Sequence, residues 1–98
     1  MSGDVKIFLT RLGQIIAKVV EETDTGYLLS QPAILTPTQT NVAMFPVLGL
    51  TKEKEVWLEK TNLELHAADG KQGLEPVVEI VNHYNSMFGS GIQIAQSI

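Results

Sequence analysis

The chain has 98 residues, of which 44% are hydrophobic, it contains no cysteine, and its formal net charge is −4. This length predicts one domain over residues 1–98 with a modest core, and the lack of cysteine excludes a disulfide framework and a thiolate metal site. No apolar stretch is long enough to span a membrane, and the first four residues do not look like the start of a signal peptide, so we expect a cytoplasmic protein.

Charge is unevenly distributed along the chain. Residues 1–52 carry equal numbers of basic and acidic side chains, whereas residues 53–98 carry three lysines against seven acidic residues. No basic patch can be recognised, and this argues against a protein that binds duplex DNA through its phosphates. Single-stranded nucleic acid, held mainly by base stacking and a few cations, stays compatible with this charge.

The first half of the chain has the pattern of β-strands. Val5–Thr10 alternates apolar and polar residues, which predicts a strand with one buried face. Gly13–Leu35 then predicts one long hairpin, because a β-branched run, a polar break and a second apolar run follow one another. The first of these runs is apolar on both faces, so we expect that strand to be buried on two sides for much of its length.

Two points in this hairpin carry specific expectations. In the turn at residues 23–26, Asp24 can cap its own backbone, and Gly26 can adopt a positive φ. Further along, Pro32 cannot donate a ladder hydrogen bond, so the return strand is expected to bulge, bend or reach an edge there.

The middle of the chain predicts further strands. Val42–Leu50 is strongly apolar but contains Pro46 and Gly49, which favours a bent strand at an edge that another chain could cover. The charged residues 51–55 predict a surface loop. Val56–Leu65 again has the texture of a strand, with a turn or a bulge at Lys60–Asn62.

The end of the chain changes period. Residues 69–73 predict a flexible turn, and Pro76–Phe88 predicts an amphipathic helix that stops before a glycine. Its apolar face comprises Val77, Ile80, Val81, Tyr84 and Phe88. The tail, residues 89–98, alternates isoleucine with polar residues and predicts a short strand or an apolar arm.

No catalytic or metal-binding pattern can be recognised. His66 and His83 are 17 positions apart and have no third ligand at a metal spacing, and no local signature marks a nucleophile. We therefore expect a protein that is not an enzyme and that needs no cofactor or metal.

The order of these elements resembles the Sm-like (LSm and Hfq-type) small β-barrel over Val5–Leu65. In the family's first motif Gly13, Asp24 and Leu29 match, whereas Thr23 replaces an aromatic residue, Tyr27 stands for a methionine and Leu28 replaces an asparagine. The second motif corresponds weakly to Lys60, Thr61 and Asn62. The resemblance implies a mainly β fold, namely a five-stranded, strongly bent antiparallel Sm-like (SH3-like) barrel over residues 5–67, followed here by the helix over 76–88.

The same resemblance implies a function. Family subunits form closed rings by pairing the fourth strand of one copy with the fifth of the next, so we expect a cyclic homo-oligomer, from a pentamer to a heptamer. Family rings bind short single-stranded RNA, which implies Asp24, Tyr27, Lys60 and Asn62 as RNA-binding residues. A helix placed after the barrel is similar to small phage-encoded Sm-like proteins, for which the compartment is the host cytoplasm.

One departure from the family keeps an alternative open. The asparagine that holds RNA bases in the family is Leu28 here, and the chain is acidic overall. The alternative is a homo-oligomeric protein scaffold, or a phage assembly or accessory protein, that binds no nucleic acid and docks partners on its helix and tail.

Overall fold

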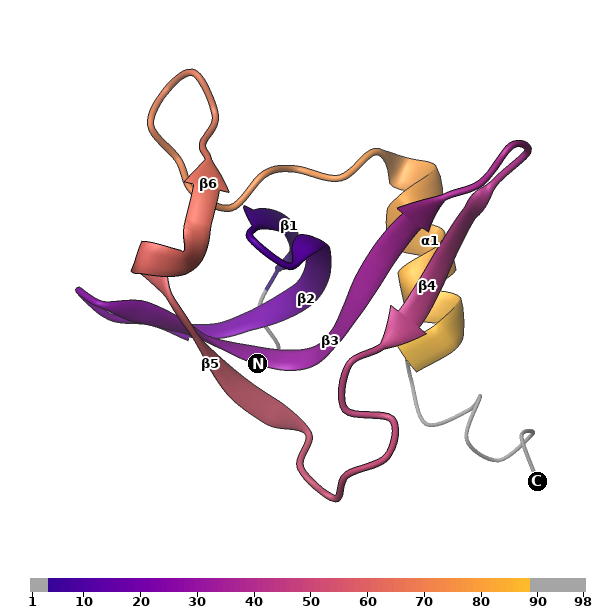
Figure 1. Ribbon diagram of the computed structural model, residues 1–98, viewed down its shortest axis with the longest axis horizontal. Helices are drawn as coiled ribbons and strands as arrows, with labels where there is room; N and C mark the ends of the chain where they lie inside the picture. The colour runs from indigo at the N-terminus through magenta and orange to yellow at the C-terminus, as the bar shows by residue number, and fades with distance from the viewer. Residues whose placement is uncertain (1–3, 89–98) are drawn as a thin grey trace.

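One antiparallel sheet with a helix beside it makes up residues 4–88, the part of the chain that the computed structural model describes (Figure 1). Its strands are β1 (Val5–Thr10), β2 (Gly13–Glu22), β3 (Gly26–Pro37), β4 (Val42–Pro46), β5 (Glu55–Glu59) and β6 (Leu63–Leu65). A short 3-10 helix, η1 (Lys60–Asn62), joins β5 to β6, and α1 (Val78–Phe88) follows. The prediction of a mainly β fold with a C-terminal helix is confirmed.

The sheet is open rather than closed. Its strand order is β4-β3-β2-β1-β6, and β5 also pairs with β3. The long strand β3 pairs with β5 along Gly26–Ser30 and with β4 along Ala33–Pro37. Over the described residues β6 pairs with neither β4 nor β5, so the predicted five-stranded closed barrel is corrected to a six-stranded open sheet.

The extra strand arises where one strand was predicted over Val56–Leu65. β5 pairs with β3, whereas β6 pairs with Leu9 and Thr10 of β1. In the strand order, β2 lies between β3 and β1. The chain therefore has to change direction between the two strands. It does so at η1, and the predicted turn or bulge at Lys60–Asn62 is a 3-10 turn.

The predicted irregularity near Pro32 is a β-bulge. The pairing of β2 with β3 shifts register between Ile16, which faces Ala33, and Lys18, which faces Ser30. Gln31 lies inside this shift with a φ of 52°, a left-handed conformation that a glutamine rarely adopts. A bulge bends the strand that contains it, and β3 changes its pairing partner from β5 to β4 at this point.

The predicted turn at Gly13 is also present. Thr10 pairs with Gly13 across a two-residue turn, and Gly13 has a φ of 121°, which glycine adopts without strain. The Thr10 hydroxyl donates to the Gly13 carbonyl oxygen at 2.9 Å and accepts the Leu12 N–H at 3.1 Å. These bonds hold the β1–β2 connection tight.

The core consists of two clusters on either side of the bend. One contains Phe8, Ala17, Tyr27 and Leu29, and the other contains Ile16, Ala33, Leu35, Met44 and Tyr84. Neighbouring residues of β2 belong to different clusters because successive side chains point to opposite faces of a strand. β2 is therefore buried on two sides at residues 15–17 only, which is a shorter stretch than the sequence predicts.

The helix covers the second cluster. α1 lies beside the half of the sheet that β3 and β4 form (Figure 1), and Ile80, Tyr84 and Phe88 pack against the core there. The helix begins at Val78 rather than Pro76. Val77 is 63% exposed, so its predicted place on the buried face is wrong.

One further prediction is wrong, and another concerns residues outside the described part of the chain. β4 ends at Pro46, and residues 47–50 form a turn, so the predicted strand to Leu50 is too long. The Val47 N–H still donates to the Pro32 carbonyl oxygen at 2.9 Å, one position beyond the pair Ala33–Pro46, and the chain turns after this bond. The predicted strand or arm in the tail falls on residues 89–98, outside the described part.

Candidate functional site

The tip of the β2–β3 hairpin is organised by a threonine. The Thr23 hydroxyl oxygen accepts the Gly26 N–H at 3.1 Å and the Thr25 N–H at 3.3 Å, and the Thr23 N–H donates to the Gly26 carbonyl oxygen at 2.8 Å. Asp24, which was expected to cap this turn, is exposed and caps nothing that the structure records.

Gly26 is required for a different reason from the one expected. Glycines with positive φ among the described residues are Gly13 and Gly70, and Gly26 is not one of them. A Cβ atom at Gly26 would instead lie 2.8 Å from the Leu58 carbonyl oxygen of β5. The glycine therefore allows β5 to approach the start of β3 closely.

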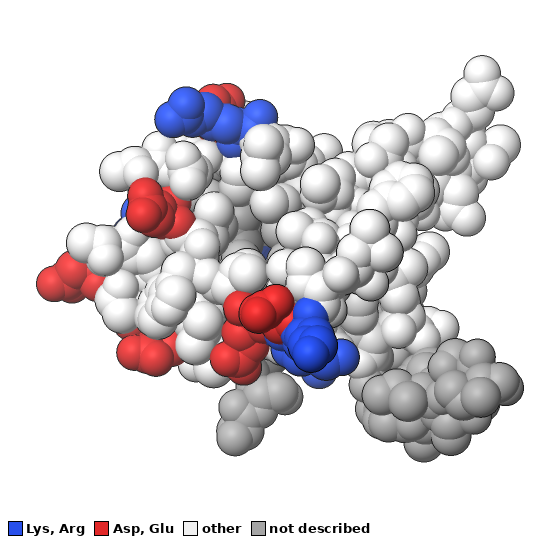
Figure 2. Space-filling model, turned by 60° about the horizontal axis from the view of Figure 1, so that its bottom comes forward, with Lys and Arg blue, Asp and Glu red and all other residues white. Residues whose placement is uncertain are grey.

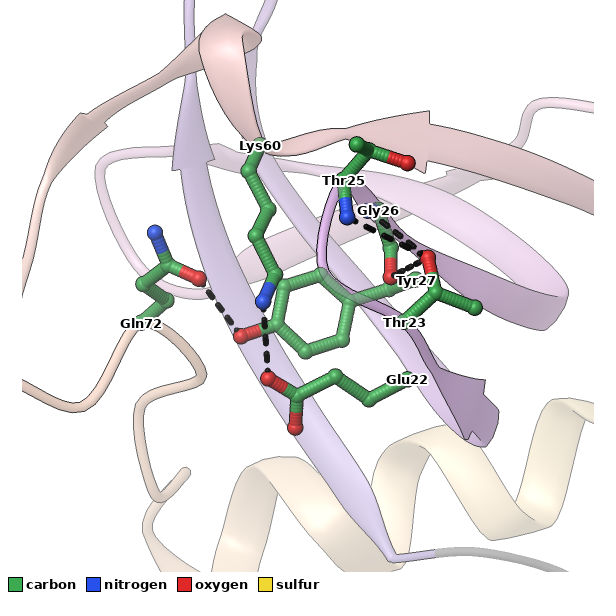
Figure 3. A network of polar contacts seen from close by, with 7 residues as sticks. All are labelled: Glu22, Thr23, Thr25, Gly26, Tyr27, Lys60 and Gln72. Carbon is green, nitrogen blue, oxygen red and sulfur yellow. Dashed lines mark hydrogen bonds and ion pairs between the residues drawn. The ribbon is translucent and has the colours of Figure 1, made fainter.

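Tyr27 is a core residue. Its exposed fraction is 6%, and its ring centroid lies 4.9 Å from that of Phe8. The hydroxyl donates to Oε1 of Gln72 at 2.7 Å (Figure 3). Burial, followed by the charge of Glu22, raises the pKa of Tyr27, while Lys60 opposes this increase. Because so little of Tyr27 is exposed, its ring offers a base little surface on which to stack within one copy.

Lys60 joins the end of β5 to the hairpin tip. Its ammonium lies 2.9 Å from Oε2 of Glu22 and 5.2 Å from the centre of the Tyr27 ring (Figure 3). Its backbone N–H donates to the Thr25 carbonyl oxygen at 2.9 Å. The hydrogen bond to Glu22 is the main cause that raises the pKa of Lys60, and Asp24 makes the smallest contribution. This ammonium can donate hydrogen bonds to an acceptor oxygen, but Glu22 already uses one of them.

Asn62 lies apart from these residues. Its backbone carbonyl oxygen accepts the Arg11 N–H at 3.2 Å. Asn62 also lines a 310 Å³ cavity whose other walls are Thr10, Arg11, Leu12, Ile15 and Leu58. The structure thus brings Tyr27 and Lys60 into contact, places Asp24 within electrostatic reach of Lys60, and directs Asn62 towards the β1–β2 turn.

A larger pocket opens beside Tyr27. Its volume is 570 Å³, and it lies between β1, β2 and the loop at residues 70–73. Leu74 places this loop, because its N–H and carbonyl oxygen both bond to Ile7 of β1, at 2.8 and 2.9 Å. Gln72 and Lys6 line this pocket, and neither was predicted from the sequence. A turn at residues 69–73 was predicted, but no local pattern reveals that it folds over β1.

The pocket has balanced charge. Asp4 and Glu22 line it together with Lys6 and Lys71, and the Lys6 ammonium pairs with Glu75. The hydrogen bond from Lys6, followed by the charge of Lys6, lowers the pKa of Glu75. On the face in Figure 2, basic side chains form small groups that lie directly beside acidic side chains, and no continuous basic patch is visible. This arrangement provides no positive field that would attract a phosphate backbone.

Two other kinds of feature, a metal site and a membrane-spanning helix, are not found in residues 4–88. No group of three or more histidine, cysteine, aspartate or glutamate side chains there could hold a metal ion. Over the same residues, no helix has the length and apolar character needed to cross a membrane.

The chain was compared with known proteins. A scan against models of protein families gives no match, and a search of curated proteins gives none either. What the protein does is therefore inferred from its own residues and their geometry.

Proposed function

We propose that this protein is a non-enzymatic, ring-forming protein of the Sm-like type, which assembles with copies of itself into a scaffold for other proteins. The proposal depends on one observation: the sheet has two unlike open edges. β4 and β5 lie beyond β3 on one side, and β6 lies beyond β1 on the other. An open edge presents unpaired backbone donors and acceptors that can pair with another chain.

Both edges also expose large apolar side chains. Phe45 on β4 is 57% exposed, Trp57 on β5 is 54% exposed and Leu65 on β6 is 61% exposed. A strand edge with apolar residues favours association, because pairing would bury these side chains as it satisfies the backbone.

The two edges differ, and this favours a ring over a simple dimer. When the β4–β5 side of one copy pairs with β6 of the next, the pair still has one free edge of each kind, because each copy has used only one of its two edges. Such a head-to-tail contact continues until the chain of copies closes on itself or grows into a filament. The bend in β3 and the resemblance to Sm-like proteins both favour closure.

The assembly is tested by placing a charge on each edge. Trp57→Glu on β5 and Leu65→Glu on β6 should each lower the native mass of the protein towards that of one chain. Leu50→Glu is the matched control, since Leu50 is fully exposed but lies in the turn after β4 and on no edge strand. Edge variants that stay assembled while their circular dichroism remains native would refute the proposal.

Single-stranded RNA is the second candidate ligand of the ring, and one contact favours it. Lys60, from the stretch that corresponds to the family's second motif, lies against the hairpin tip that belongs to its first motif, with Thr25 as its backbone partner. The two segments that would hold RNA bases are thus neighbours. Balanced charge and the buried Tyr27 ring oppose this role, so we rank it below the protein scaffold.

The RNA proposal is tested by releasing Lys60 from its ion pair. Glu22→Gln frees the ammonium, so it should raise the affinity for a short oligoribonucleotide, and Lys60→Met should lower it. Lys52→Met is the control for loss of charge, because Lys52 is an exposed residue of the loop before β5. Fluorescence anisotropy at about 50 mM salt measures the affinity, since phosphate contacts weaken as salt rises. A flat titration of the wild-type protein would exclude RNA.

A further inference from the structure

An apolar groove lies where the last turn of α1 meets the turn after β4. Its walls are Pro32 and Pro46 from the sheet, Leu48 from the turn, and Met87 and Phe88 from the helix. Its volume is 310 Å³, at the small end of the range of about 300 to 1,000 Å³ that pockets for organic ligands span. A short apolar peptide segment suits this size.

The charged side chains at the rim of the groove balance each other. Glu53 and Lys54, of opposite sign, both border it, and Gln31 and Thr51 are neutral. An uncharged occupant therefore meets no unbalanced charge there. Met87 lines the groove and is more than one third exposed, so an occupant would bury apolar surface that the described residues leave in contact with water.

We propose that the segment of this same chain that follows α1 occupies the groove, with Ile92 and Ile94 as the side chains that enter it. Three features of residues 89–98 support this assignment. The segment starts directly after Phe88, which is itself a wall of the groove. It begins with glycine, serine and glycine, which permit a sharp reversal of direction. It carries no charged side chain, and its isoleucines alternate with a glutamine, so that they face one side of an extended segment.

Connectivity also favours this occupant over a separate partner. An extended chain covers about 3.3 to 3.6 Å per residue, so a few residues after Phe88 suffice to return along the groove. A segment tethered by so short a linker has an effective concentration in the millimolar range. A free peptide or a second protein would have to displace it.

The lack of native cysteine allows a direct test by cross-linking. The full-length variant Leu48→Cys/Ile94→Cys should form a disulfide within one chain on mild oxidation. The matched control is Gln39→Cys/Ile94→Cys, since Gln39 is exposed in the β3–β4 turn and does not line the groove. The groove pair should cross-link at least about tenfold faster than the control pair, in line with a tethered ligand at its site. Adding Ile92→Ser to the groove pair should slow the reaction.

Two outcomes would overturn the proposal. One is equal rates for the groove pair and the control pair. The other is a disulfide between separate chains when Leu48→Cys protein is mixed with Ile94→Cys protein, which would assign the groove to the tail of another copy. The pair Pro46→Cys/Ile92→Cys repeats the test if the first variant fails to fold. Because the cross-link is read within one chain, the result does not depend on whether the protein forms a ring.

Discussion

The hydroxyl of Tyr84 lies 2.8 Å from the backbone carbonyl oxygen of Gln31, and it lies 3.1 Å from that of Ser30. This contact ties the middle of α1 to the bulge of β3. A bulge leaves backbone groups outside the ladder, and a buried carbonyl without a partner is costly. Tyr84 is fully buried and supplies that partner, so the helix and the bend in the sheet stabilise each other.

Removing this hydroxyl should weaken the fold. Tyr84→Phe keeps the ring in the core but removes the hydroxyl that donates to the two carbonyls, so we expect a loss of about 1 to 2 kcal/mol in the free energy of unfolding. Chemical denaturation measures it. Tyr27→Phe is the control, because its partner Gln72 is a partly exposed side chain that can turn to water, and its loss should be smaller. Equal losses would contradict a special role for Tyr84.

The same residue predicts how stability depends on alkaline pH. Burial raises the pKa of Tyr84 from 10.0 to about 12, and a bond from the Lys18 backbone opposes this only in part. The unfolded chain therefore releases the Tyr84 proton first as pH rises. Its contribution to stability is complete below pH 10.0 and is lost as the pH rises towards about 12.

Urea unfolding at a series of alkaline pH values tests this expectation. Wild-type stability should fall more steeply above pH 10 than that of Tyr84→Phe, which has no proton to lose at this position. Parallel curves for the two proteins would show that the pKa of Tyr84 is the same in the folded and the unfolded chain.

Close approach of β5 to β3 predicts a second stability effect. Gly26→Ala would place a Cβ atom 2.8 Å from the Leu58 carbonyl oxygen, so the two strands would have to separate. We expect a loss of about 1 to 3 kcal/mol, the usual range for overpacking. Gly49→Ala is the matched control, because its nearest atom lies at an ordinary 3.5 Å, and its effect should be near zero. Thermal melts measure both effects. Equal melting temperatures for Gly26→Ala and Gly49→Ala would contradict this expectation.

Local features of the fold could be predicted from the sequence, since each has a local cause. Gly13 opens a tight turn, and Pro32 marks the bulge. Tyr84 was predicted to lie on the buried face of the helix, and it does. Its hydrogen bond to the bulge could not be predicted, because that bond depends on where the helix docks and no periodicity encodes this.

The open sheet and the candidate site were predicted less well for the same reason. The pattern of Val56–Leu65 predicts one strand. The segment instead forms two strands, because its first part pairs with β3 and its last part pairs with β1. Tyr27 and Lys60 were expected at one site and do meet, whereas the backbone carbonyl of Asn62 bonds to Arg11 in the β1–β2 turn. Gln72 reaches Tyr27 through the distant pairing of Leu74 with Ile7.

The most direct test of the central claim is the native mass of the purified full-length protein at micromolar concentration, measured gently enough to preserve bound oligonucleotide. A closed ring joined by its two unlike edges predicts a single species at one integer multiple of the chain mass. Additional mass that ribonuclease removes would place RNA ahead of the protein scaffold. A mass equal to one chain would contradict the account, since the exposed edges of β4, β5 and β6 would then join nothing.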